Sequence, residues 1–342
     1  MDIINFRVEE VRLETPGCYT YILKEITGKT VHYKAGQFLT LLLTINGREV
    51  RRSYSLSSAP LVDAYLSVTV KRVSNGEVSR YIIEHVKQGD IIRALHPAGR
   101  FTINSYNEEL FCFIAAGSGI TPVYALIKSL LNHSAQHQLL LIYQSRNEDS
   151  AIYRKQLLLL QEGFKDTFII IELFSQPINH SLQPARLNNF LLEQIVKQQV
   201  HTMSVQYFIC GPPLFMKMAE FTLKTIGFNP SNIFKENFVI DTPPPPALMI
   251  DTNVRKVSIH HKHREFEIQV KYPESILQAA LRQHVSLPYS CRGGRCSTCT
   301  VRLLSGKVKM TINDVLTEKD MAEGLILTCV GYAETDVVLR VE

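Results

Sequence analysis

Four cysteines near the end of the chain have the spacing of an iron–sulfur ligand set. Cys291, Cys296 and Cys299 form a C-x4-C-x2-C loop with two glycines inside it, and Cys329 follows further along the chain. Plant-type [2Fe–2S] sites have this spacing, because one loop supplies three thiolates and a separate strand supplies the fourth. Zinc sites instead use short C-x2-C pairs in a tetrahedral arrangement, which the four-residue gap fits poorly. We predict a [2Fe–2S] cluster, with zinc as the alternative.

The remaining cysteines and a histidine tract have structural interpretations. Cys112 lies inside an apolar stretch, which predicts a small buried core residue. Cys18 follows Pro16-Gly17, so we expect it in a turn without a functional role. The tract at residues 260–263 is better explained as a solvated hairpin tip than as a metal site.

A second group of residues could bind a flavin dinucleotide. Arg52 and Tyr54 alternate on a predicted strand and therefore share a face, with Ser55 directly after them. A cation and a flat ring are what a pyrophosphate and an isoalloxazine need. The same pair also occurs on ordinary protein surfaces. Residues 70–72 and the helix start at residues 76–79 strengthen the flavin interpretation, because backbone N–H groups at a helix start bind phosphate.

A third group could bind a nicotinamide nucleotide. The turn that contains Gly117, Gly119 and Thr121 follows an apolar strand and opens a helix, although it is shorter than G-x-G-x-x-G. On its own such a turn often only packs a helix against a sheet. Cys210-Gly211-Pro212 also stands where an apolar strand ends. Ligands of parallel sheets gather at these strand ends, so two such turns predict a dinucleotide cleft.

The residues after the second strand of this region bear on nucleotide preference. Ser145 and Arg146 lie where the adenosine ribose is expected, and no acid precedes Glu148. An arginine attracts a 2′-phosphate, whereas an acid would repel it and select NADH. Gln176, rather than arginine, follows Ser175 and weakens that preference. NADPH is slightly favoured, and the choice between NADPH and NADH stays open.

The elements that must position these residues fall into distinct patterns. Short strands rich in β-branched and aromatic residues occupy the first hundred residues, at 37–43, 52–56 and 65–72, separated by turn signals. This pattern predicts a small antiparallel barrel. From residue 110, apolar strands alternate with amphipathic helices, which predicts a parallel sheet covered on both faces. We expect these strands at 111–116, 138–143, 168–174 and 205–210, and the helices at 122–131, 151–161, 187–198 and 215–226.

Four consecutive prolines at residues 243–246 mark the clearest boundary, because they end regular structure and favour an extended spacer. The last segment combines short strands at 254–260 and 265–272 with a helix at 274–284. We therefore predict a barrel over residues 1–105, a parallel-sheet domain over 106–240, a linker over 241–252 and a cluster domain over 253–342.

Composition excludes several classes of protein. The chain has 342 residues, of which 45% are hydrophobic and 20% charged, as expected for two or three globular domains. A net charge of +5 is too small to indicate nucleic-acid binding. No apolar run reaches the roughly 18 residues of a membrane helix, and no signal peptide is apparent. Seven cysteines, four of them in one short region, indicate a cytoplasmic, reducing location.

Taken in order, these motifs resemble the ferredoxin–NADP reductase superfamily, with a plant-type ferredoxin domain added at residues 253–342. The resemblance implies a multidomain fold: an antiparallel β-barrel that binds FAD, an α/β parallel-sheet domain that binds NAD(P), and an α+β (β-grasp) [2Fe–2S] domain. Related reductases use FMN, but residues 76–79 favour FAD. The resemblance also implies site roles. The implied catalytic residues are Cys210 at the nicotinamide ring, Ser55 near the flavin N5, and Glu236. The implied cofactor-binding residues are Arg52, Tyr54, Ser55, Val70, Lys71, Arg72, Gly76, Val78, Ser79, Gly117, Gly119, Thr121, Ser145, Arg146, Gly211, Pro212 and Phe238.

The three cofactors together imply a function. Nicotinamide gives two electrons as a hydride, a [2Fe–2S] cluster takes one at a time, and a flavin does both. The domain order resembles reductase components of multicomponent oxygenases, such as a phenylacetyl-CoA epoxidase-like system. We therefore expect electrons to pass from NAD(P)H to FAD, then to the cluster, then to a separate oxygenase. Alternatives are another acceptor (a hybrid-cluster protein, a desaturase or a P450) or a non-enzymatic redox sensor. No nucleic-acid or membrane partner is expected.

Overall fold

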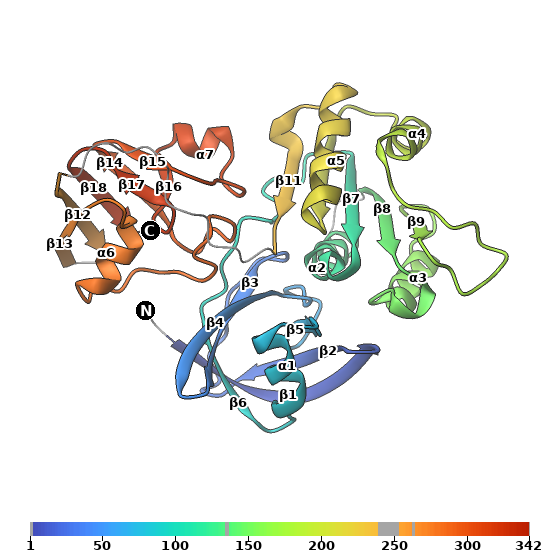
Figure 1. The fold of residues 1–342 in the computed structure, drawn as a ribbon. Helices are drawn as coiled ribbons and strands as arrows, with labels where there is room; N and C mark the ends of the chain where they lie inside the picture. The colour runs from blue at the N-terminus through green and yellow to red at the C-terminus, as the bar shows by residue number, and fades with distance from the viewer. Residues whose placement is uncertain (1–2, 134–136, 239–252, 262–263, 342) are drawn as a thin grey trace. The chain divides into compact units, whose positions relative to one another are not determined.

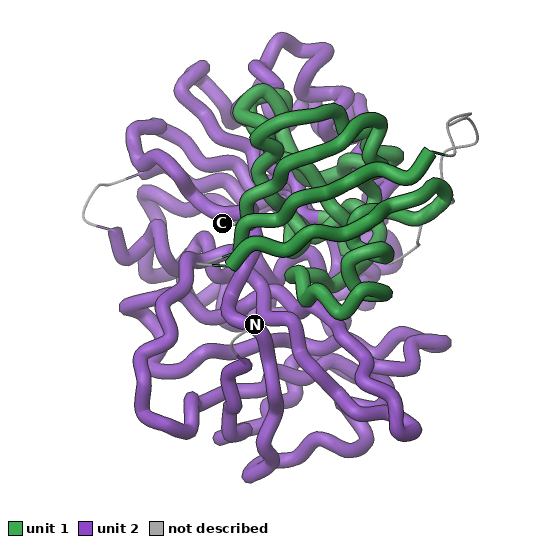
Figure 2. Tube along the Cα trace, turned by 90° about the vertical axis from the view of Figure 1, so that its left-hand side faces the viewer, with its two compact units in different colours: residues 1–2, 237–342 green, residues 3–236 purple. Residues whose placement is uncertain are grey.

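The computed structural model describes residues 3–133, 137–238, 253–261 and 264–341. Two compact units divide the chain, one over Ile3–Glu236 and the other over residues 237–342 (Figure 2). The predicted barrel and parallel-sheet domains both lie within the first unit. The proline-rich linker falls outside the described residues, and the predicted domain boundaries remain predictions. None of the described helices is long and apolar enough to cross a bilayer.

The first unit begins with a six-stranded antiparallel barrel (Figure 1), in the order β4-β3-β6-β1-β2-β5. A bridge between Leu56 and Val68 pairs the two ends of this order and closes the barrel. The β3–β4 hairpin turns at Asn46-Gly47 with φ of 50° and 74°, as a type I′ turn requires. The elements are β1 (Ile3–Thr15), β2 (Cys18–Glu25), β3 (Phe38–Ile45), β4 (Arg48–Ser55), β5 (Leu66–Lys71), α1 (Glu77–His85) and β6 (Ile91–Leu95).

The expectation that Cys18 lies in a turn is wrong. The turn ends at Gly17, whose φ is 73°, and Cys18 opens β2 with no exposed surface. Its side chain joins a core that also contains Phe113 and Leu126 of the parallel-sheet region. Turn chemistry locates Gly17 correctly, but the burial of Cys18 depends on packing between the barrel and the next domain.

A five-stranded parallel sheet follows, in the order β11-β10-β7-β8-β9. Alternate residues of its strands enter two different cores: Phe111 and Phe113 face one, whereas Cys112 and Ile114 face the other. Both faces are therefore covered, which explains why these strands are apolar throughout. Cys112 is fully buried, as predicted. The elements are β7 (Leu110–Ala116), α2 (Ile120–Leu131), β8 (Gln138–Ser145), α3 (Arg154–Gly163), β9 (Phe168–Phe174), α4 (Asn189–Gln199), β10 (Val205–Cys210), α5 (Pro213–Thr225) and β11 (Ile233–Glu236).

Helix α3 begins three residues later than predicted. Tyr153 stands at its start with a left-handed φ of 60°, which a helix interior does not accept. Residues 148–150 form a separate 3-10 turn before it. The periodicity predicts the helix but not this break, because Tyr153 is held by contacts with distant parts of the chain.

The second unit contains a five-stranded sheet in the order β13-β12-β18-β14-β16 and a β15–β17 pair. Helix α6 buries four apolar residues in the core of this unit. It is shorter than predicted, because Ser275 and Gln278 form a capping box that fixes its start. Half of the histidine tract ends β12, and Lys262-His263 lie outside the described residues. The elements are β12 (Arg255–His261), β13 (Arg264–Val270), α6 (Ile276–Arg282), β14 (Thr300–Ser305), β15 (Val308–Met310), α7 (Glu318–Ala322), β16 (Leu325–Leu327), β17 (Gly331–Ala333) and β18 (Val337–Val341).

Candidate functional site

The three predicted catalytic residues come together where the barrel meets the parallel sheet. Cys210 at the end of β10 is paired in register with Glu236 at the end of β11. The Ser55 hydroxyl, at the end of β4, donates a hydrogen bond to Glu236 Oε2 at 2.8 Å. All three residues are buried, with Cys210 completely so. A hydroxyl, a carboxyl and a thiol from three strand ends therefore form one polar group in an apolar setting.

Burial shifts the protonation of this group. It raises the pKa of the Glu236 carboxyl from 4.5 to about 8, and the Ser55 hydrogen bond opposes the shift only in part. The pKa of the Cys210 thiol is raised as well, by burial first and by the neighbouring Glu236 charge second. At neutral pH the site thus holds a proton on Glu236 and an uncharged thiol.

The raised pKa predicts a distinctive pH dependence for Glu236→Gln. Folded wild-type protein holds the Glu236 proton more tightly than the unfolded chain, so its stability is highest below pH 4.5 and falls between pH 4.5 and about 8. The full shift corresponds to roughly 5 kcal/mol. Urea unfolding of both proteins from pH 4 to 9 should show wild type losing stability relative to the variant across this window.

Glu220→Gln is the control, because the pH dependence of stability expected from Glu220 has the opposite sign. The pKa of Glu220 is lowered despite partial burial, because Lys224 and Lys235 pair with its carboxylate. Glu220 therefore stabilises the folded protein above the pKa that this group has in the unfolded chain, and this stabilisation is lost as the pH falls through its lower folded-state pKa. Identical pH profiles for the two variants would contradict the assignment of a protonated Glu236.

The two glycine turns pack directly against each other. A Cβ atom on Gly119 would lie 2.2 Å from the Cys210 carbonyl oxygen and 2.8 Å from the Gly211 nitrogen. Gly117 has a φ of 56°, and a Cβ there would lie 3.7 Å from Lys71 Nζ of the barrel. Gly119 is required by its close approach to Cys210, whereas Gly117 is required by its left-handed φ. Predicted nicotinamide residues on β7–α2 and β10–α5 thus adjoin a predicted flavin residue on β5.

The other predicted nicotinamide residues border the same turns. Thr121 is buried in the first turn of α2, and Pro212 precedes the first turn of α5. The α5 start has no side-chain cap, as expected where a ligand meets a helix N-terminus.

The predicted flavin residues divide into two groups. Arg52 and Tyr54 lie on β4 and are half-buried, and the Arg52 guanidinium donates to the Arg51 carbonyl at 2.8 Å. Val70 and Val78 turn their side chains into the barrel core. These two residues can therefore meet a flavin only through their backbone.

The start of α1 offers backbone groups rather than side chains. Gly76 is its N-cap, and no side chain caps the helix there. The Ser79 hydroxyl accepts from the Val73 N–H at 3.1 Å and so stabilises the loop. Arg72 forms a 3.2 Å ion pair with Glu84 on the same helix. An α-helix start with uncapped N–H groups suits a phosphate, which fits the pyrophosphate predicted there.

Arg146 and Ser145 end β8 at the same edge of the sheet. Ser145 is buried, whereas Arg146 is exposed and its Nε donates to Gln176 Oε1 at 2.8 Å. Gln176, which weakened the sequence argument for NADPH, thus orients the arginine. Phe238 is 41% exposed and belongs to the second unit, so its predicted place at the flavin remains a prediction.

We expect Arg146→Asp to move preference toward NADH. An arginine pairs with a 2′-phosphate, and an aspartate repels it while accepting from the ribose hydroxyls of NADH. The ratio of kcat/KM for NADPH over NADH should fall by about tenfold or more. Lys165→Asp is the control, because it makes the same charge reversal before β9, at the opposite end of the strands. An equal ratio in all three proteins would remove Arg146 from the ribose site.

The four cluster cysteines converge within the second unit. The Cys291 N–H donates to Cys296 Sγ at 3.4 Å, and the Gly293 N–H donates to Cys291 Sγ at 3.3 Å. The Cys291 thiol also lies within hydrogen-bonding reach of Cys329, which in turn reaches Cys299. Four thiols with N–H donors around them form a donor set that fits an iron–sulfur cluster.

Two contacts fix the cysteine loop in this shape. Thr328 donates from both its N–H and its hydroxyl to the Cys299 carbonyl at 3.1 Å, which brings the next residue, Cys329, beside the loop. Asp314 accepts from Arg295 Nε at 3.1 Å, and its N–H donates to the Gly294 carbonyl.

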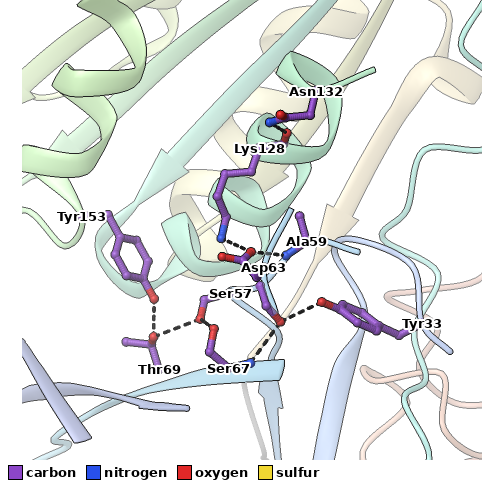
Figure 3. Close-up of polar contacts among 10 residues, drawn as sticks. Tyr33, Ser57, Ala59, Asp63, Ser67, Thr69, Lys128, Asn132 and Tyr153 are labelled. Atoms are coloured by element: carbon purple, nitrogen blue, oxygen red, sulfur yellow. Dashed lines mark hydrogen bonds and ion pairs between the residues drawn. The ribbon is translucent and has the colours of Figure 1, made fainter. Parts of the chain in front are cut away.

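Sequence reasoning missed polar residues between the barrel and the parallel sheet, including Asp63, Thr69, Lys128 and Tyr153 (Figure 3). The one feature of the sequence that could have pointed to these residues is Lys128, a lysine on the apolar face of α2.

Comparison with known proteins identifies three domain families in this chain, in the order predicted from the motifs. Residues 18–103 match the oxidoreductase FAD-binding domain, residues 113–220 the oxidoreductase NAD-binding domain, and residues 259–334 the 2Fe-2S iron-sulfur cluster binding domain. The chain is 33% identical over 327 residues to a subunit of the 1,2-phenylacetyl-CoA epoxidase of Escherichia coli strain K12, covering 94% of this chain and 92% of that protein.

Two further matches extend across all three domains. The ferredoxin reductase component of 3-ketosteroid-9-alpha-monooxygenase from Mycolicibacterium smegmatis is 32% identical, covering 98% of this chain and 96% of that protein. The fold is similar to that of phthalate dioxygenase reductase, with a TM-score of 0.62 and 21% identity, covering 99% of this chain and 98% of that one. The chain therefore belongs to the ferredoxin-reductase family of oxygenase reductase components, NAD(P)H-dependent oxidoreductases that combine FAD-binding, NAD-binding and [2Fe–2S] domains and pass electrons to oxygenases.

Proposed function

We propose that Ser55, Cys210 and Glu236 form the reaction centre for hydride transfer between nicotinamide and flavin. The contact between Ser55 and Glu236 carries this proposal, because it joins residues 181 positions apart in a buried place. It lies beside Cys210, at the strand ends where parallel sheets bind their ligands. When bound, the flavin accepts a hydride and releases electrons singly.

Each residue of this centre has a separate task. Glu236 holds a proton at its carboxyl below about pH 8, and the Ser55 hydroxyl donates a hydrogen bond that orients this carboxyl. The uncharged Cys210 thiol offers a small polarizable surface for a nicotinamide ring. The tight packing of Gly119 on Cys210 excludes water from this side of the centre.

The remaining residues hold the cofactors. Arg52 supplies positive charge and the start of α1 supplies N–H groups for the flavin pyrophosphate, Lys71 lines the flavin, and Tyr54 supplies a flat surface for its ring. Gly117, Gly119 and Gly211 provide the backbone cradle for the nucleotide. Cys291, Cys296, Cys299 and Cys329 ligate the cluster.

We propose as acceptor the separate oxygenase component of a phenylacetyl-CoA epoxidase-like system. The full-length similarity to the Escherichia coli epoxidase subunit supports this choice over a P450, desaturase or hybrid-cluster acceptor. Seven cysteines, four of them gathered as the proposed cluster ligands, support a reducing, cytoplasmic setting.

The test is reconstitution with purified components. The protein, loaded with FAD and cluster, is mixed with NADPH or NADH and with candidate oxygenases, and product formation and cytochrome c reduction are followed. We expect rapid cytochrome c reduction with every preparation and product only with an epoxidase-type oxygenase. Slow cytochrome c reduction would favour a redox sensor, and product with a P450 alone would overturn the proposed acceptor.

A further inference from the structure

A partly buried ion pair and a buried hydroxyl contact join the barrel to α2 and to the start of α3, the helices that follow β7 and β8 (Figure 3). Lys128 of α2 pairs with Asp63, which lies in the loop between β4 and β5. The Tyr153 hydroxyl, at the start of α3, contacts the Thr69 hydroxyl on β5. We call these two contacts together the interdomain clasp. Both contacts lie within the first compact unit.

The surroundings of the Lys128 ammonium group favour pairing with Asp63. Its side chain is 10% exposed, on an otherwise apolar helix face, and its Nζ lies 4.6 Å from the centre of the Tyr124 ring. Asp63 also accepts a hydrogen bond from the Ala59 N–H at 2.7 Å, so the loop itself is braced where the lysine binds. A lysine with a long apolar stem and a buried head requires a charge partner, and Asp63 meets that requirement.

Tyr153 forms the second half of the clasp. It is buried, its left-handed φ of 60° delays the start of α3, and its ring stacks on Tyr124 with centroids 4.4 Å apart. Its partner Thr69 also shares a 2.7 Å hydrogen bond with Thr20 of the neighbouring strand β2. Since Tyr124 contacts both Lys128 and Tyr153, the two contacts are parts of one connected structure.

The clasp connects the elements that carry the proposed cofactor residues. Helix α2 starts directly after Gly117 and Gly119, and Tyr153 ends the loop that follows Ser145 and Arg146. On the barrel side, the Asp63 loop follows Ser55, and Thr69 lies two residues before Lys71. The proposed nucleotide contacts that follow β7 and β8 thus lie on elements held at one end of the clasp, and the proposed flavin strands lie at the other end. The proposed contacts that follow β10 lie outside the clasp.

We propose that Lys128 and Tyr153 are positioning residues for hydride transfer, which hold the nucleotide-binding helices at a fixed distance and angle from the flavin strands. This inference rests on the proposed function, because it assigns hydride transfer to this site. Hydride transfer depends steeply on donor–acceptor geometry, so a small displacement of α2 against β4 and β5 slows the reaction more than it weakens nucleotide binding.

The two ion-pair partners differ in a way that guides the choice of variant. Asp63 is 34% exposed and can regain water when its partner is removed. Lys128 cannot, so Asp63→Asn leaves a buried, unpaired ammonium group, whereas Lys128→Met leaves none. Lys128→Met also keeps the length of the side chain. Lys128→Met should therefore fold normally while losing the ion-pair half of the clasp, and Asp63→Asn should be the less stable of the two variants.

The experiment compares wild type, Lys128→Met, Lys128→Arg and a matched control, Lys197→Met. Lys197, like Lys128, is a helix lysine that forms an ion pair with a carboxylate. Its partner is Glu193, and the pair lies on the exposed surface of α4. Anaerobic rapid mixing with saturating NADPH or NADH gives the limiting rate of flavin reduction, and its concentration dependence gives the nucleotide dissociation constant. Amide hydrogen exchange, measured without nucleotide, reports on residues 57–69 and 120–131.

We expect Lys128→Met to lower the limiting rate about tenfold with less than a threefold change in the dissociation constant. Exchange should be faster in both segments. Lys128→Arg should recover most of the rate, and Lys197→Met should match wild type. A wild-type limiting rate in Lys128→Met overturns the inference, as does unchanged exchange. If wild-type protein does not reduce its flavin with either nucleotide, the proposed function fails, and the exchange comparison still decides whether the clasp holds the two parts together.

Discussion

Cys296→Ser is expected to abolish the iron–sulfur cluster while leaving reduction of the flavin by NAD(P)H intact. A serine hydroxyl is a poor iron ligand compared with a thiolate, and Cys296 has an N–H donor from Cys291 aimed at its sulfur. Apart from Phe238, the proposed flavin and nucleotide residues lie in a different compact unit, which ends at Glu236. Iron and sulfide content should fall below about a tenth of wild type, and electron delivery to an oxygenase should be lost.

The measurement combines metal analysis with anaerobic bleaching of the flavin absorbance by NADPH or NADH. Cys112→Ala is the control, because it also removes one thiol, but from a buried position in the parallel sheet, far along the chain from the cluster loop. It should keep both cofactors. Loss of flavin from Cys296→Ser would show that the two units do not hold their cofactors independently, and full cluster content would remove Cys296 from the ligand set.

Gly119→Ala is expected to be the most damaging change in the nucleotide site for its size. The added methyl group would meet backbone atoms of Cys210 and Gly211, which cannot rotate away as a flexible side chain could. Overpacking of this kind costs about 1–3 kcal/mol of stability. The added methyl group should also push apart the two turns that cradle the nucleotide. The limiting rate of flavin reduction should therefore fall by about a hundredfold.

Gly163→Ala makes the same chemical change without a clash. No atom lies within 4 Å of a Cβ built at Gly163, which ends α3. Alanine favours helices over glycine by about 1 kcal/mol, so this variant should be as stable as wild type or more so. Thermal unfolding compares the stabilities of Gly119→Ala and Gly163→Ala, and rapid mixing compares their limiting rates of flavin reduction. A wild-type rate in Gly119→Ala would mean that the contact between the turns is not needed for nucleotide binding.

The proton held on Glu236 connects the fold to the proposed reaction. Burying a carboxyl group at the ends of three strands costs stability at neutral pH, and the sequence retains it beside Ser55 and Cys210. Groups that are held in an unusual protonation state at a strand end are typical of catalytic sites. The pH profile expected for Glu236→Gln therefore tests the fold and the proposed mechanism together.

Local patterns along the chain are enough to predict the cofactor classes, the order of the domains and most of the elements. The cysteine spacing from Cys291 to Cys299 is a property of one loop, and the periods of the apolar residues reflect the geometry of single strands and helices. Turn residues such as Asn46-Gly47 act within four residues. These features can be read without knowing which distant segments meet.

Which of these residues act together depends instead on how distant segments pack. The contact of Ser55 with Glu236, the burial of Cys18 and the pairing of Lys128 with Asp63 all join segments far apart in the chain. Their pKa values, exposure and partners arise from packing between the barrel and the parallel sheet, which no local pattern records. The break before α3 has the same origin, because the backbone of Tyr153 is strained where its side chain binds the barrel.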